Sequence, residues 1–272
     1  MKSELIVLIL SAIAGIIGTG IGGVVGAFVK DKSPSAVANM LAFAAGTMLG
    51  ITAFEMLPEA VRNVNSFKAE FLGRVLVICV TFAGTAVAAL LGFLTDKASK
   101  KRQITALEYP KRKRIADGGK ALTRSENGLK TAGIATFIAI ALHNIPEGMA
   151  IGASGAGSLM AGIVVAFVIA LHNVPEGMAV SAPLVGGGIK PPKAVALSLA
   201  AGSTTLAGAV IGMLVGGINE LACGLSVSLA SGVMIFVACF DLLPLAARMR
   251  DSFPSFSFFM GIAVALVFSL LF

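Results

Sequence analysis

The sequence predicts an all-α integral membrane protein with eight transmembrane helices. The 272-residue chain is 57% hydrophobic and 13% charged, with a mean hydropathy of +0.93, which excludes an ordinary soluble domain. Its apolar runs of about 20 residues are long enough to cross a bilayer as helices. The runs show no alternation of apolar and polar residues, which argues against a membrane barrel.

The predicted spans follow one another along the whole chain. They lie at residues 4–29, 36–58, 72–95, 131–153, 158–182, 191–216, 222–247 and 253–271. The first resembles a signal peptide, but it is about 25 residues long and matches a later span, so we expect it in the mature protein. Residues 96–130 form the only long polar stretch, predicted to be a basic cytoplasmic loop. The other connections are short, which favours one transmembrane domain over residues 1–272.

The distribution of charge predicts how the chain is oriented. If the spans are crossed in turn, all but four of the 21 Lys and Arg residues fall on one side. Basic residues concentrate on the cytoplasmic side, so both termini are predicted to be extracytoplasmic and the protein to lie in the cell (inner) membrane. The basic loop is expected to bind anionic lipid headgroups. With Tyr109 as its one aromatic residue, the loop does not fit a nucleic-acid interface.

Two sequence matches indicate an internal repeat. Residues 46–58 match residues 232–244 at an offset of 186, and residues 11–15 match residues 198–202 at an offset of 187. Spans one to three (repeat one, 1–95) therefore pair with spans six to eight (repeat two, 191–272). Partners run in opposite directions, because they stand five spans apart. This inverted repeat of three plus two plus three helices is typical of secondary transporters, whose sites lie near the midplane.

The two central spans, within residues 131–182, carry one nonapeptide written twice. Residues 142–150 read Leu-His-Asn-Ile-Pro-Glu-Gly-Met-Ala, and residues 171–179 differ from them at one position. Both histidines of the chain lie in these copies. Ionisable residues are costly inside a membrane, and their presence there points to function.

The polar residues of the motif are predicted to bind a divalent metal ion. In each copy they lie three or four residues apart and share one face of a helix. Imidazole with carboxylate suits zinc and neighbouring transition metals, whereas carboxylate and amide oxygens alone suit harder ions. One metal, or two that share the glutamates, would fit. The candidate ligands are His143, Asn144, Glu147, His172, Asn173 and Glu176.

Each copy also contains a proline and a glycine. Pro146 and Pro175 cannot donate to the carbonyl four residues earlier, which membrane helices tolerate where neighbouring groups or water satisfy it. Gly148 and Gly177 are predicted to allow close approach of another helix.

Further carboxylates lie outside the motif. Glu55 and Asp241 occupy equivalent repeat positions, each three residues before a proline. They belong either to an ion pathway or to the interface near helix ends, where charge is less costly. Glu59 is expected to be interfacial. The three cysteines lie in apolar spans, so we expect them to be packing residues and not a disulfide framework.

The paired motif resembles that of a known family. His-Asn-x-Pro-Glu-Gly on two successive helices, after a long basic loop and among eight spans, resembles the ZIP (Zrt/Irt-like) family of divalent-metal transporters, in particular its bacterial GufA-like branch. The resemblance covers essentially the whole chain. It implies import of zinc, often with iron, manganese or cadmium, into the cytoplasm, with no cofactor and no catalytic residues. It also implies that the metal-site helices move as a block against a scaffold, often in a homodimer.

The resemblance further implies a centre with two metals. One would be held by the two histidines and two glutamates, and the other by Asn144 and Asn173 with both glutamates bridging. Related bacterial proteins commonly add a carboxylate from the sixth helix, where this chain has Thr205 or its neighbour. A hydroxyl is a weaker ligand, so the second metal is expected to bind weakly or not at all.

Two other functions compete with transport. An intramembrane metallohydrolase would use a glutamate to activate a metal-bound water, but the His-x-x-x-Glu spacing differs from the usual two-histidine motif. A metal sensor would bind without flux, and it needs no inverted repeat. The sequence therefore favours a transporter over an enzyme.

Overall fold

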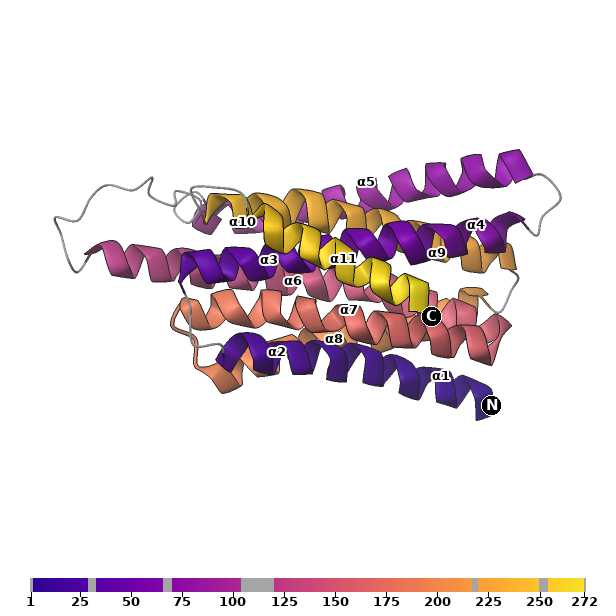
Figure 1. Ribbon diagram of the computed structural model, residues 1–272, viewed down its shortest axis with the longest axis horizontal. Coiled ribbons are helices and arrows are strands. Elements are labelled where there is room, and N and C mark those ends of the chain that lie inside the picture. The colour runs from indigo at the N-terminus through magenta and orange to yellow at the C-terminus, as the bar shows by residue number, and fades with distance from the viewer. Residues whose placement is uncertain are drawn as a thin grey trace.

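The computed structural model describes residues 2–28, 33–65, 70–103, 120–216, 220–249 and 254–271 (Figure 1). These segments are built from helices, and none of the described residues lies in a strand. In chain order the elements are α1 (Lys2–Ala12), η1 (Ile13–Ile17), α2 (Gly18–Phe28), α3 (Pro34–Ile51), η2 (Thr52–Met56), α4 (Leu57–Asn65), α5 (Glu70–Gln103), α6 (Lys120–Gly157), α7 (Leu159–Gly186), α8 (Pro191–Gly216), α9 (Glu220–Phe236), η3 (Val237–Leu242), α10 (Leu243–Arg248) and α11 (Ser255–Leu271), where η marks a π-helix.

Seven helical runs among the described residues are long and apolar enough to cross a membrane. Three of them contain a π-helix joined to its neighbours without a break: α1–η1–α2, α3–η2–α4 and α9–η3–α10. An eighth apolar run, α11, has 17 residues and is about 25 Å long at 1.5 Å per residue. These runs match the eight predicted spans in order, which confirms the all-α membrane fold.

The predicted loop at residues 96–130 is partly helical, which corrects its boundaries. The helix α5 continues to Gln103 and α6 begins at Lys120. Both extensions consist largely of residues that favour helix, namely Lys, Arg, Ala, Gln, Glu and Leu, which let a span continue beyond its apolar stretch. Residues 104–119 lie outside the described residues. So do Lys30, Lys32, Lys68 and Arg250, four of the basic residues whose distribution predicted the orientation.

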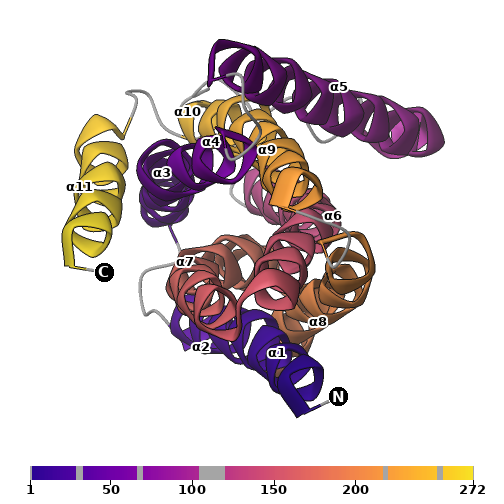
Figure 2. The ribbon, with the colours of Figure 1, turned by 90° about the vertical axis from the view of Figure 1, so that its right-hand side faces the viewer.

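The helices form two groups (Figure 2). The motif group consists of α1–η1–α2, α6, α7 and α8, which pack on one another and contain the duplicated nonapeptide. The flanking group consists of the remaining elements, in which α11 packs on α3 and α5 packs on α9. Contacts of α3 with α7 and of α9 with α6 join the two groups.

The contacts follow the predicted inverted repeat. The packing of α6 on α8 has its counterpart in α7 on α1–α2, and the packing of α3 on α11 has its counterpart in α9 on α5. Two hydrogen bonds show the same equivalence between the two repeats. Asn144 Nδ2 donates to the Ala201 carbonyl and Asn173 Nδ2 donates to the Ala14 carbonyl, each at 3.0 Å. Ala14 and Ala201 are partners at the predicted offset of 187.

A π-helix explains why the repeats match at two offsets. A Cβ atom on Gly148 would overlap the Thr205 carbonyl, and one on Gly177 would overlap the Thr19 carbonyl. Gly148 and Gly177 are equivalent positions of the two motif copies, so the threonines that they face, Thr205 and Thr19, are also equivalent, at an offset of 186. Because Ala14 and Ala201 are equivalent at an offset of 187, the first repeat has one more residue between its alanine and its threonine. The π-helix η1 lies in this interval and accommodates the extra residue.

Candidate metal centre

The duplicated motif lies near the middle of α6 and α7, which run unbroken through its prolines. Gly148 and Gly177 allow α6 to approach α8, and α7 to approach α2, at backbone contact, as predicted. The histidine and glutamate side chains of both copies are at most 1% exposed. Four ionisable groups are therefore buried between two helices that are long and apolar enough to cross a membrane, where charge is costly.

The two histidines and two glutamates converge on one point. His172 Nε2 lies 2.6 Å from Glu147 Oε1 and 2.8 Å from Glu176 Oε1. His143 Nε2 lies 2.8 Å from Glu176 Oε1 and 3.4 Å from Glu147 Oε1. All four ligand atoms lie within 4.8 Å of one another. In a tetrahedral zinc site with bonds of about 2.0–2.1 Å, neighbouring ligand atoms are about 3.3 Å apart, so small outward shifts of these side chains would fit the ion.

The two histidine rings are held differently. His143 Nδ1 lies 3.2 Å from the Ala139 carbonyl, to which an Nδ1–H can donate, and its Nε2 faces the carboxylates. A hydrogen bond from the second ring nitrogen is typical of metal-ligating histidines. His172 Nδ1 has no hydrogen-bond partner among the described residues. One histidine is thus oriented by the backbone and the other by the cluster alone.

The two asparagines present their oxygen atoms unpaired. Their amide nitrogens bind neighbouring carbonyls, but Asn144 Oδ1 and Asn173 Oδ1 are buried without a hydrogen-bond partner in the described part of the chain. The Oε2 atoms of both glutamates and the hydroxyl of Thr205 share this property. Buried oxygens without a partner are unfavourable, and a cation would satisfy them.

The structure does not bring Glu55 or Asp241 into the cluster. They lie in the π-helices η2 and η3 at equivalent positions, where Glu55 is half-buried and Asp241 is exposed. Isolated π-helical turns frequently occur at functional sites. A pathway role for these two carboxylates stays a prediction. Sequence reasoning did not anticipate the π-helices, although the change of offset in the repeat was a signal for η1.

The sequence comparisons agree with this geometry. A family model described as ZIP Zinc transporter matches residues 94–269. The chain belongs to the ZIP family of zinc transporters. A zinc transporter ZupT of Akkermansia muciniphila is 32% identical over 246 residues, which cover 90% of this chain and 88% of that protein. A zinc transporter ZupT of Clostridium perfringens is 29% identical over 255 residues, which cover 91% and 89%.

Membership in the ZIP family decides between the two predicted classes of protein, a transporter and an enzyme. It makes the chain a multi-pass membrane protein of metal transport and not an enzyme, which sets the metallohydrolase alternative aside. The paired His-Asn-x-Pro-Glu-Gly motif was therefore a sound basis for the predicted resemblance.

Proposed function

We propose that this ZIP protein carries zinc into the cytoplasm through the His–Glu centre. The observation that carries the proposal is the convergence of two imidazole nitrogens and two carboxylate oxygens within 4.8 Å in the buried interior of the helix bundle. Two carboxylates balance the charge of a divalent ion, and nitrogen with oxygen ligands suits zinc. Two relatives named as zinc transporters support the same cargo. Iron, manganese and cadmium share part of this ligand preference and are secondary cargoes.

One zinc ion is expected to bind tightly, through His143, Glu147, His172 and Glu176. A second position would use the unpaired oxygens of Asn144 and Asn173 with the bridging glutamates. Its binding is weak, because Thr205 offers a neutral hydroxyl in place of a carboxylate. A structure of the zinc-soaked protein with two fully occupied ions at the His–Glu centre would contradict this assignment.

The arrangement of helices supports transport by movement of the motif group. This group is packed within itself and meets the flanking group mainly through α3 with α7 and α9 with α6. A shift of one group against the other would expose the centre to each side in turn. We assign the bundle end that holds the N-terminus to the extracytoplasmic side, from the predicted charge bias.

Zinc influx into proteoliposomes that contain an encapsulated zinc dye tests the proposal. Flux is expected for the native chain and should collapse in Glu176→Ala. Glu70→Ala is the matched control, since Glu70 is an exposed carboxylate paired with Arg74. Binding without flux in the native chain would favour the sensor. Equal flux in the native chain and in Glu176→Ala would mean that the motif is structural.

A further inference from the structure

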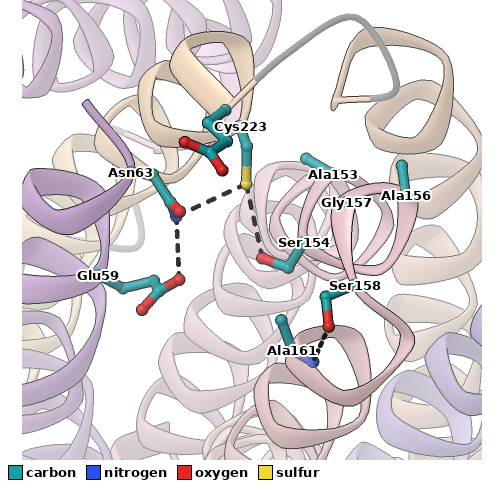
Figure 3. A pocket seen from close by; sticks show the side chains of 10 residues that line it. Glu59, Asn63, Ala153, Ser154, Ala156, Gly157, Ser158, Ala161 and Cys223 are labelled. Carbon is teal, nitrogen blue, oxygen red and sulfur yellow. Dashed lines mark hydrogen bonds between the residues drawn. The ribbon is translucent and has the colours of Figure 1, made fainter. Parts of the chain in front are cut away.

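A second polar site lies at the bundle end that holds the N-terminus. A cavity of about 280 Å³ lies there between α4, α9 and the turn that joins α6 to α7 (Figure 3). Its polar lining consists of Glu59, Asn63, Ser154, Ser158, Glu220 and Cys223. A water molecule takes roughly 30 Å³ of liquid, so the cavity has room for a hydrated cation.

The side chains in this cavity form a network centred on the Asn63 amide. Asn63 Nδ2 donates to Glu59 Oε1 at 2.9 Å and to Cys223 Sγ at 3.7 Å, and Ser154 Oγ lies 3.7 Å from the same sulfur (Figure 3). Arg62 holds the other carboxylate oxygen, Glu59 Oε2, at 2.6 Å. The amide N–H group, the positive end of a dipole, therefore lies between a carboxylate and a sulfur atom. A cation bound between the same two acceptors would take its place.

The inverted repeat shows that this polarity is not a by-product of the fold. At the opposite end of the bundle, the partners of Cys223, Ser154, Glu59 and Asn63 are Val37, Pro183, Leu245 and Met249. Three of these four apolar residues are buried and the fourth packs against the core. Equivalent backbone positions therefore close one end of the molecule and form a polar cavity at the other.

The cavity also lies in line with the metal centre. Ser154 follows Glu147 by seven residues on α6, which places it about two turns and 10 Å further along the same face. Ser154 belongs to the motif group, whereas Glu59, Asn63 and Cys223 belong to the flanking group. An ion in the cavity would touch both groups at once.

We propose that this cavity is an outer binding site for a thiophilic divalent cation, zinc or cadmium, with Cys223 Sγ and the Glu59 carboxylate as ligands. The Ser154 hydroxyl and the Asn63 amide oxygen complete its shell after rotation of the amide, and Glu220 adds negative charge. Binding replaces the thiol proton, which passes to water, because the thiolate is the ligand. Magnesium and calcium prefer all-oxygen sites, so the sulfur selects softer ions before they reach the centre. Cys223 is then a ligand, where the sequence predicted a packing residue.

The direction in which ions would pass this site rests on the proposed function, whereas cation binding at the site does not depend on it. Binding is tested by titrating cadmium into the purified full-length protein and recording the ultraviolet charge-transfer band of a thiolate–cadmium bond. The band is expected in the native chain and in Cys239→Ser, a control from the same helical run, and should be lost in Cys223→Ser. Glu59→Gln should raise the cadmium concentration that gives half of the band. Retained zinc binding at the centre, measured by calorimetry, shows that each variant is folded.

The outcomes separate this site from the transport proposal. No band in the native chain, or an equal band in Cys223→Ser, would overturn the outer site. A band that persists in Glu176→Ala would support a site independent of the centre. A band in a native chain without zinc flux would uphold the outer site while the transport proposal failed. Zinc flux in a native chain that shows no band would overturn the outer site and uphold the transport proposal.

Discussion

Glu147 Oε1 lies 2.6 Å from His172 Nε2, although the two residues belong to different helices. Each histidine is nearer to the glutamate of the other copy than to that of its own, by 2.6 against 2.8 Å for His172 and 2.8 against 3.4 Å for His143. The inverted repeat produces this exchange, because it places the two copies face to face. The centre is one shared unit and not two separate sites.

His172→Ala and Glu147→Gln are expected to be strongly coupled. If both side chains hold the same ion, either change alone should weaken zinc binding by at least about 100-fold, and the double variant should bind no more weakly than the worse single one. Calorimetric titration of zinc into the four proteins measures the coupling. Losses that simply add would mean that the two residues bind zinc independently.

Zinc binding is expected to weaken as the pH falls. The imidazoles and carboxylates must be deprotonated to bind zinc, so protons compete with the ion and are released when it binds. Zinc titrations in two buffers with different ionisation enthalpies give the number of protons released. A zinc affinity that does not change between acidic and neutral pH would contradict the expectation.

Thr205→Glu is expected to raise the number of zinc ions bound at the His–Glu centre from one to two. The Thr205 hydroxyl is fully buried and has no partner among the described residues, and a carboxylate there would supply the charge that the second position lacks. Thr205→Gln is the matched control, with the same size and no charge. Metal analysis of the purified variants, each made in a Cys223→Ser background to remove the outer site, counts the ions at the centre. A single zinc ion in Thr205→Glu would refute this account of the second position.

Gly148→Ala is expected to destabilise the motif group. Its Cβ would overlap the Thr205 carbonyl, so α6 and α8 would have to separate, at a cost of about 1–3 kcal/mol. Gly157→Ala, where the added Cβ would meet no atom of another part of the chain within 4 Å, should leave the melting temperature in detergent nearly unchanged. Equal melting temperatures for the two variants would show that this contact does not limit stability.

Labelling of single cysteines tests the predicted orientation of the chain in the membrane. In a chain whose native cysteines are replaced by serine, Ser158→Cys should react with a membrane-impermeant maleimide added to intact cells. Lys190→Cys, exposed at the opposite end of the bundle, should react only after the cells are opened. The reverse pattern would place both termini in the cytoplasm and invert the assignment of the outer cavity.

Much of this protein could be predicted from its sequence, because the bilayer restricts what such a sequence can form. A spanning helix needs about 20 apolar residues, so the length and composition of each apolar run are enough to locate the spans. The four residues of the candidate metal centre stood out for a related reason, since His143, Glu147, His172 and Glu176 are costly within apolar spans and occur in duplicate.

Only the tertiary structure decided how distant residues meet. The exchange of partners between the two histidines depends on how α6 and α7 face each other, and the two repeat offsets required the π-helix η1. The cavity at the bundle end that holds the N-terminus joins Asn63, Ser154 and Cys223, which lie on three helices far apart in the sequence. No local spacing marks such a set, because its geometry is fixed by side-chain packing between helices and not by the period of any one of them.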